Sequence, residues 1–307
     1  MPMETITGEL ELARAGFYWR KLDGVQALVC APLEEAGFRN GFSTRGGGTS
    51  PMPEHALNLA GFNEDTAENI LENRRRFLKL FPSGPGGWAL AGCWQVHGSD
   101  VRLINQLDEA RPAEDARGDT IYCDAIVSNA RGVLAGVKTA DCVPILMGDS
   151  ATGAFAAVHA GWRGTLAQVA LKALERMVHE YGTRPPDVIV AIGPAAGACC
   201  YEVGTDVIEA FRSSFPNQDL FTATRAAHAC IDLLKSNREQ LLSAGVAADR
   251  IYVAPLCTMC RPDLFFSYRR EKNVQGKVGR LMSVIGRAAA ERDRGRGTGK
   301  QGNGGKG

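Results

Sequence analysis

Histidine is scarce in this chain, and charge of one sign is not in excess. The 307 residues include 5 histidines, and 35 Lys and Arg nearly balance 34 Asp and Glu, so the formal net charge is +1. No G-x-G-x-x-G follows a predicted strand and no G-x-x-x-x-G-K-[ST] occurs, so the fingerprints of dinucleotide and P-loop folds are absent. The balanced charge predicts neither nucleic acid nor an anionic membrane as a partner.

Long apolar runs are also missing. No run approaches the roughly 18 residues that a membrane-spanning helix needs, and the N-terminus has acidic residues but no apolar signal region. We therefore expect a soluble, cytoplasmic protein. Its 9 cysteines are an odd number without the spacing of a small disulfide scaffold, which predicts free thiols in a reducing compartment.

The order of apolar runs predicts an α/β fold with a mixed sheet rather than regular βαβ winding. Strands are expected at 25–32, 38–44, 88–98, 120–129, 132–147, 154–161, 187–194 and 250–257. Helices are expected at 64–81, 165–181, 204–215, 230–244 and 278–292, and 45–53 reads as a glycine-rich loop. We predict a loosely ordered N-terminus at 1–16, one domain at 17–292, and a disordered Gly/Lys/Arg tail at 293–307.

Two histidines and one cysteine are placed where a site could form. His97 and His159 each end an apolar, strand-like run and are followed by Gly within two residues, which predicts imidazoles at the rim of a sheet. Either imidazole could instead only form hydrogen bonds to backbone groups at a strand end. Cys142, in "KTADCVPIL", could be a metal ligand, a nucleophile or a small buried hydrophobe. Two histidines and one thiolate would make a three-ligand zinc site with an open fourth position.

Arginines in loops are candidates for holding an anion. Arg45 heads "RGGG", and Arg163 in "GWRGT" leads directly into a helix, where a guanidinium beside backbone N–H groups suits phosphate. Solvated loop charges are the alternative. Asp124 and Asp141 could support a neighbouring site or cap turns. The remaining cysteines are interpreted as core packing, including the adjacent Cys199 and Cys200, while the single C-x-x-C, Cys257 and Cys260, is a weak zinc signal.

Several motifs occur together in a fixed order: "GFSTRGGGTS", "LNLA", "QVHG", "TADCVPIL", "HAGWRGT", "AIGPAAGACCYEVG" and "FFSYRR". Over residues 25–288 the chain resembles the bacterial laccase-domain family, also described as multicopper polyphenol oxidase-like. Members of that family are regarded as purine nucleoside phosphorylases with adenosine deaminase activity. The segment "GFNEDTAEN" after "LNLA" departs from the family pattern.

The resemblance implies a fold, a cofactor and a reaction. The fold would be a single-domain sandwich of mixed β-sheet flanked by helices, similar to that of cysteine hydrolases. One zinc ion would be held by His97, Cys142 and His159, which would be the catalytic residues. The substrates would be adenosine, inosine or methylthioadenosine with inorganic phosphate. We place the phosphate on Arg45 or Arg163, place Asp141 beside the metal, and expect a monomer or weak homodimer.

Three other functions are alternatives to this reaction. A multicopper oxidase needs many more histidines than 5, so the sequence argues against copper chemistry. Cys142 activated by His159 could make the protein a cysteine hydrolase or amidase acting on a peptidoglycan precursor. A structural zinc site would make it a non-enzymatic metal-binding protein.

Overall fold

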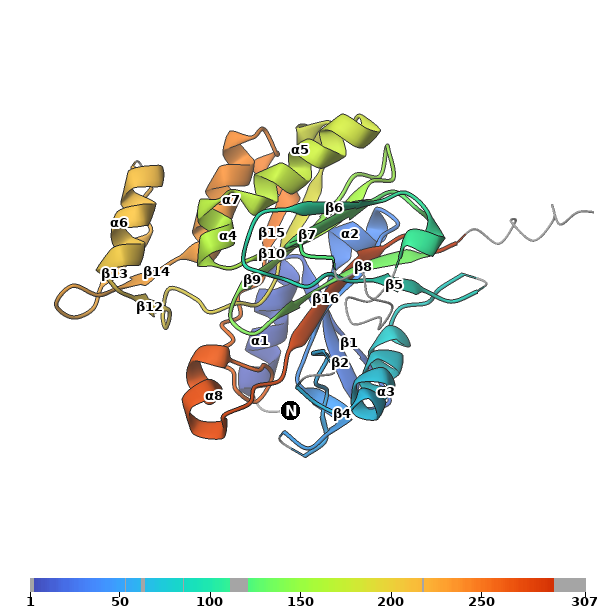
Figure 1. The fold of residues 1–307 in the computed structure, drawn as a ribbon, viewed down its shortest axis with the longest axis horizontal. Helices are drawn as coiled ribbons and strands as arrows, with labels where there is room; N and C mark the ends of the chain where they lie inside the picture. The colour runs from blue at the N-terminus through green and yellow to red at the C-terminus, as the bar shows by residue number, and fades with distance from the viewer. Residues whose placement is uncertain are drawn as a thin grey trace, which may run out of the picture.

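The computed structural model describes residues 3–52, 54–61, 64–84, 86–110, 121–216 and 218–289. Two six-stranded mixed sheets pack face to face (Figure 1). The first runs in the order β1 (Phe17–Leu22), β2 (Val25–Cys30), β3 (Arg39–Ser43), β16 (Leu281–Gly286), β8 (Val133–Thr139) and β5 (Ala89–Ala91). The second runs in the order β15 (Ile251–Val253), β11 (Ile189–Ile192), β9 (Val143–Gly148), β10 (Phe155–Ala160), β7 (Ala125–Ser128) and β6 (Val101–Ile104).

Helices lie on the outer faces of this sandwich and around its edges. They are α1 (Met3–Arg14), α2 (Ala31–Glu35), α3 (Ala67–Leu78), α4 (Trp162–Leu166), α5 (Val169–Tyr181), α6 (Thr205–Ser214), α7 (Leu233–Ser243) and α8 (Tyr268–Gln275). A small antiparallel sheet, β12 (Glu202–Val203), β14 (Ala229–Ile231) and β13 (Phe221–Ala223), lies beside α6. Strand β4 (Gly46–Ser50) belongs to none of the three sheets and lies against β2 and α3. Short 3-10 turns lie at Leu107–Glu109, Pro185–Asp187 and Ala248–Arg250.

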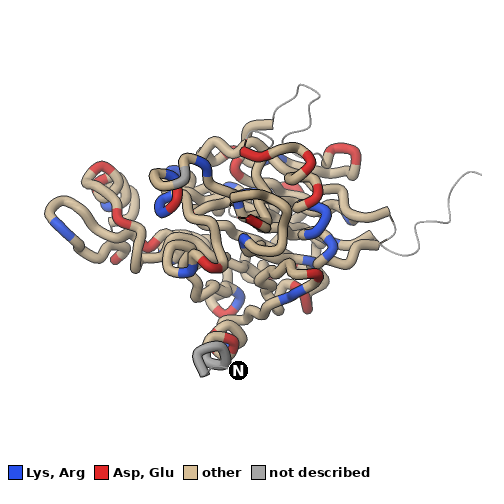
Figure 2. The backbone as a smooth tube through the Cα atoms, turned by 90° about the horizontal axis from the view of Figure 1, so that it is seen from below, with Lys and Arg blue, Asp and Glu red and all other residues tan. Residues whose placement is uncertain are grey.

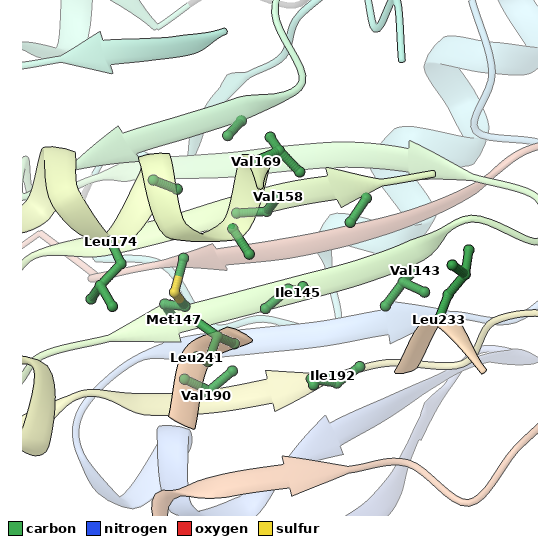
Figure 3. Close-up of a cluster of buried hydrophobic side chains, with 14 of the residues drawn as sticks. Val143, Ile145, Met147, Val158, Val169, Leu174, Val190, Ile192, Leu233 and Leu241 are labelled. Carbon is green, nitrogen blue, oxygen red and sulfur yellow. The ribbon is translucent and has the colours of Figure 1, made fainter. Parts of the chain in front are cut away.

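Apolar side chains fill three layers. Between the sheets, Leu28 and Phe42 meet Leu146 and Phe155. Outside the second sheet, β9, β10 and β11 pack against α5 and α7, as Figure 3 shows for Val143, Ile145, Leu174 and Leu241. Outside the first sheet, α3 contributes Phe77. Strands covered on both faces carry apolar residues on both, which explains the unbroken apolar runs of the sequence.

The predicted α/β sandwich of mixed sheets is confirmed, with most elements near their expected places. The helix predicted at 165–181 is divided in two, because Gln168 adopts a left-handed φ of 58° between α4 and α5. The helix predicted at 230–244 begins instead with strand β14 and continues as α7.

The prediction of a helix at 278–292 was wrong. Residues Leu281–Gly286 form strand β16, which pairs with β3 and β8 in the middle of the first sheet. Every residue of β16 is buried, so its apolar run carries no alternation by which periodicity could identify a strand.

Within the segment 1–16, which the sequence predicts to be loosely ordered, helix α1 spans Met3–Arg14. Leu12 packs into the core with Phe17. Gly16 ends the helix at a φ of 83°, where a Cβ would lie 2.6 Å from the ring of Tyr252. The tail predicted at 293–307 lies outside the described residues.

Basic and acidic residues are interspersed over the fold, as Figure 2 shows, which agrees with the balanced net charge. In the part of the chain that the structure describes, no helix combines the length and apolar character needed to cross a membrane.

Candidate functional site

The two rim histidines and Cys142 converge at one end of the second sheet. Cys142 immediately precedes β9, and His159 lies next to the last residue of β10; the antiparallel register pairs His159 with Pro144. The prediction that His97 ends a strand was wrong: β5 ends at Ala91, and His97 lies in a bend beyond it at a left-handed φ of 60°. One ligand atom from each of the three residues lies within 4.8 Å of the others. They therefore form a candidate metal centre.

Gly161 leaves room for this arrangement. A Cβ at that position would lie 3.0 Å from Sγ of Cys142 and 3.1 Å from Cδ2 of His97. The His97 and His159 rings meet edge to face, with centroids 4.9 Å apart. A larger residue at position 161 would push the thiol or the imidazole out of place.

Asp124 holds both histidines. It is fully buried, its Oδ1 lies 2.8 Å from Nδ1 of His159, and the backbone N–H of His97 donates to the same oxygen at 3.0 Å. Gly98 N–H donates to Oδ2 at 2.7 Å. Burial would raise the pKa of Asp124, but the bonds from His159 and the backbone outweigh it and lower that pKa. Nδ1 of His159 therefore carries the donated proton and Nε2 is left for the centre.

The thiol and imidazole of the centre shift each other's protonation. Burial would raise the pKa of Cys142, but the charges and hydrogen bonds of His159 and His97 lower it to about 6. Burial would lower the pKa of His159, but Cys142 and Asp124 raise it to about 9. Both shifts favour a thiolate beside an imidazolium in the metal-free protein, and a thiolate is the form of cysteine that ligates metals.

Asp141 supports the wall next to the centre. At a φ of 88°, it accepts hydrogen bonds from Oγ1 of Thr258 at 2.7 Å, from Oγ of Ser267 at 3.0 Å and from the N–H of Arg269 at 2.7 Å. These bonds occupy its carboxylate and join three distant segments of the chain. Asp141 thereby fixes the backbone from which Cys142 projects.

A pocket of about 580 Å³ opens above the centre and includes His97, Asp141, Cys142 and His159 in its lining. Aromatic walls come from Trp94, Trp162, Tyr201 and Tyr268, and basic groups come from Lys138, Arg163, Arg269 and Arg280. The volume suits a small-molecule site. Flat rings and cations suit a ligand with an aromatic base and an anionic group.

Arg163 is the pocket arginine least engaged by the protein. Its guanidinium lies 4.1 Å from the ring centroid of Trp162. Within the described residues no hydrogen bond or ion pair is found for it, whereas Arg269 donates to the carbonyl of Glu202 and Arg280 to that of Val278. Its guanidinium donors are therefore available to a ligand.

Arg45 lies elsewhere. Its Nη1 pairs with Oε1 of Glu271 at 2.7 Å and donates to the carbonyls of Pro262 and Phe265, and both charged side chains are nearly buried. The loop expected after it is strand β4. Arg45 is outside the pocket lining, so it is not placed to hold phosphate in this pocket.

Sequence reasoning brought together His97, Asp141, Cys142, His159 and Arg163, all of which line the pocket. It did not anticipate the aromatic walls. Tyr268 in "FFSYRR" and Trp162 in "GWRG" stood beside arginines already singled out, and that adjacency was the available signal.

A family model described as multi-copper polyphenol oxidoreductase laccase matches residues 39–288, most of the chain. The chain belongs to this laccase-like family. Its relatives include purine nucleoside phosphorylase YlmD of Geobacillus stearothermophilus, 36% identical over 266 residues that cover 85% of this chain and 94% of the relative. Another relative is adenosine deaminase RL5 from an unknown prokaryotic organism, 38% identical over 265 residues, with 85% and 94% covered.

Solved structures of the laccase-like family agree with the fold. The crystal structure of YlmD from Geobacillus stearothermophilus matches with a TM-score of 0.80 at 33% identity, covering 89% of this chain and 99% of that one. The Bacillus licheniformis protein YfiH matches with a TM-score of 0.78 at 29% identity, covering 88% and 98%.

Proposed function

We propose that this chain is a zinc-dependent purine nucleoside phosphorylase that also deaminates adenosine. The observation that carries the proposal is the set of His97, Cys142 and His159 at the floor of an aromatic pocket with basic groups in its lining. The names of relatives that share more than a third of their residues with this chain support the same class of reaction.

The donor set fits zinc. Imidazole and thiolate are both zinc ligands, and three protein ligands facing a pocket leave the open position of a catalytic zinc site, whereas structural sites use four protein ligands. Asp124 orients His159 through Nδ1, as carboxylates commonly do for metal-binding histidines. Zinc bound there would supply a Lewis acid that polarises a substrate or lowers the pKa of a water molecule.

The histidines argue against the copper chemistry of the family's name. His55, His179 and His228 are exposed and lie outside the pocket lining. A multicopper oxidase requires a separate electron-transfer site and a copper cluster built from many histidines. Two pocket histidines cannot supply both.

Other pocket residues would bind the purine and the phosphate. Trp162, Tyr201 and Tyr268 would stack on the purine, and Arg163 would hold inorganic phosphate. In phosphorolysis a phosphate oxygen bonds to C1′ of the ribose, the glycosidic C–N bond breaks, and the purine nitrogen leaves with the electron pair and takes up a proton. In deamination water adds at C6 of adenine and ammonia leaves.

One incubation tests the proposal. Protein of known zinc content is given adenosine with and without phosphate, and adenine, hypoxanthine, inosine and ribose 1-phosphate are followed. Adenine and ribose 1-phosphate should require phosphate, whereas inosine should form without it. Cys142→Ala should abolish both reactions, whereas Cys230→Ala, a cysteine variant outside the pocket, should retain them. Zinc-loaded protein that turns over no nucleoside would contradict the proposal.

A cysteine hydrolase or amidase is the second candidate, and one observation favours it. Cys142, with its pKa lowered to about 6, lies beside His159, which Asp124 orients in turn. Nucleophile, base and orienting carboxylate form the constellation of a thiol hydrolase. Metal-free protein that cleaves an amide of a peptidoglycan precursor, and that iodoacetamide inactivates, would establish this function instead.

A further inference from the structure

Four cysteines other than Cys142 gather at one place in the fold. Sγ of Cys260 lies 3.5 Å from Sγ of Cys199 and 3.4 Å from Sγ of Cys200, and the four thiols, with Cys257, lie within 4.8 Å of one another. Cys199 and Cys260 are exposed and the other two are half-buried. The prediction that Cys199 and Cys200 pack in the core is therefore wrong, whereas Cys30, Cys93, Cys123 and Cys230 are buried as expected.

We propose that Cys199, Cys200, Cys257 and Cys260 bind one structural zinc ion as a tetrathiolate site. The site is separate from the candidate centre in the pocket and does not depend on the reaction proposed there.

The distances suit a metal better than disulfides. Four sulfurs placed tetrahedrally about 2.3 Å from zinc lie about 3.8 Å apart, close to the separations found. Cys260 is nearly equidistant from Cys199 and Cys200, so no single partner is selected for it. A disulfide would also leave the remaining thiols crowded beside it. Four thiolates around one divalent cation use every member of the cluster.

One backbone group faces the cluster. Gly197 N–H donates to Sγ of Cys257 at 3.3 Å, and a hydrogen bond of this kind stabilises a thiolate. Cysteine ligates zinc as the thiolate, so zinc binding would release the protons of the thiols.

The cluster joins the two loops that carry part of the pocket wall. Residue Ala195 bridges to Cys257, and Thr258 N–H donates to the carbonyl of Ala195 at 2.9 Å. Tyr201, which lines the pocket, directly follows Cys200. Thr258, inside the C-x-x-C, donates to Asp141. Zinc bound to all four thiols would fasten these loops and keep Tyr201 and Asp141 in place.

Metal content tests the proposal on the full chain. Protein reconstituted with zinc under reducing conditions and freed of excess metal should carry two zinc ions per chain. Cys142→Ala should carry one, and the triple variant Cys142→Ala/Cys199→Ala/Cys260→Ala should carry none. Cys230→Ala, which removes a thiol outside the cluster, should still carry two. Folded Cys142→Ala protein that holds no zinc would overturn the proposal.

A second measurement does not depend on a folded triple variant. X-ray absorption at the zinc edge of Cys142→Ala should give a shell of sulfur alone at about 2.3 Å. A shell containing nitrogen or oxygen would contradict the tetrathiolate. A disulfide between Cys260 and either Cys199 or Cys200 in protein that takes up no zinc after reduction would also contradict it.

Discussion

The Asp124 carboxylate lies 2.8 Å from Nδ1 of His159 and also accepts the backbone N–H of His97. One buried carboxylate thus sets the ring of one candidate ligand and the backbone of the other. Asp124 lies just before β7, and the N–H of His159 in β10 donates to its backbone carbonyl at 2.8 Å. The pairing of β7 with β10 therefore fixes the distance between the Asp124 carboxylate and the His159 ring.

Asp124→Asn should weaken zinc binding at the pocket by about 10- to 100-fold, because the charged partner of His159 is lost while the shape is kept. Zinc affinity is measured by competition with a chelator in the Cys199→Ala/Cys260→Ala background, which isolates the pocket site. Asp149→Asn, at the opposite end of β9, changes an equally buried carboxylate and should leave the affinity unchanged. Equal affinity of Asp124→Asn and the parent would rule out the orienting role.

Arg163→Gln should raise the KM for phosphate with little change in the KM for the nucleoside. Charged hydrogen bonds contribute about 1.5–3 kcal/mol, so a rise of roughly 10- to 100-fold is expected. Initial rates at varied phosphate and saturating inosine give the value. Arg184→Gln, an exposed arginine paired with Asp187, is the matched control. A rise confined to the nucleoside KM would place Arg163 on the other substrate.

Arg45→Met should lower the free energy of unfolding by about 3–5 kcal/mol, because Glu271 would remain buried without its partner. Arg45→Met/Glu271→Leu should recover most of this loss, since replacing both charges removes the stranded one. Urea unfolding followed by circular dichroism measures the difference. The phosphate KM of the double variant should match that of the wild type; an increase would restore Arg45 as a phosphate ligand.

Alkylation of Cys142 in zinc-depleted protein should follow a midpoint near pH 6. The pKa of Cys142 is lowered to about 6, so its thiolate predominates above that pH and its reaction with iodoacetamide slows as the pH falls through 6. Peptide mass spectrometry reports each cysteine separately. Cys199, with its pKa raised to about 11, should react slowly at pH 7 in the same sample.

His159→Ala tests whether His159 causes the lowered pKa of Cys142. Removing the imidazole that stabilises the thiolate should move the midpoint for Cys142 to higher pH. An unchanged midpoint would mean that His159 does not control the thiol.

The sequence was sufficient to predict the position of a site residue where that residue flanks a buried strand. His159 ends the run that forms β10 and Cys142 precedes the run that forms β9, and pairing of neighbouring strands brought them together. The sequence assigns Asp124 no definite role, because its bond to His159 depends on how β7 pairs with β10. Local patterns indicate that a residue is at a rim, but not which group it will face.

Contacts between segments that are distant in the chain could not be predicted from the sequence. Arg45 resembled an anion-binding loop residue, yet its partner Glu271 lies 226 positions away. Cys199 and Cys257 are likewise brought together only through the loops that follow β11 and β15, which pair in parallel. Neither the Arg45–Glu271 pair nor the contact between Cys199 and Cys257 can be recognised from the spacing of nearby residues.

The central place of β16 has a consequence for synthesis. Ser283 pairs with Phe42 on one side and Val137 on the other, so the strand between β3 and β8 is made last. Until it leaves the ribosome, the growing chain carries two strand edges that lack their shared neighbour, and such edges are prone to pair with other chains. A premature stop before residue 281 would therefore remove the middle of a sheet rather than trim an end.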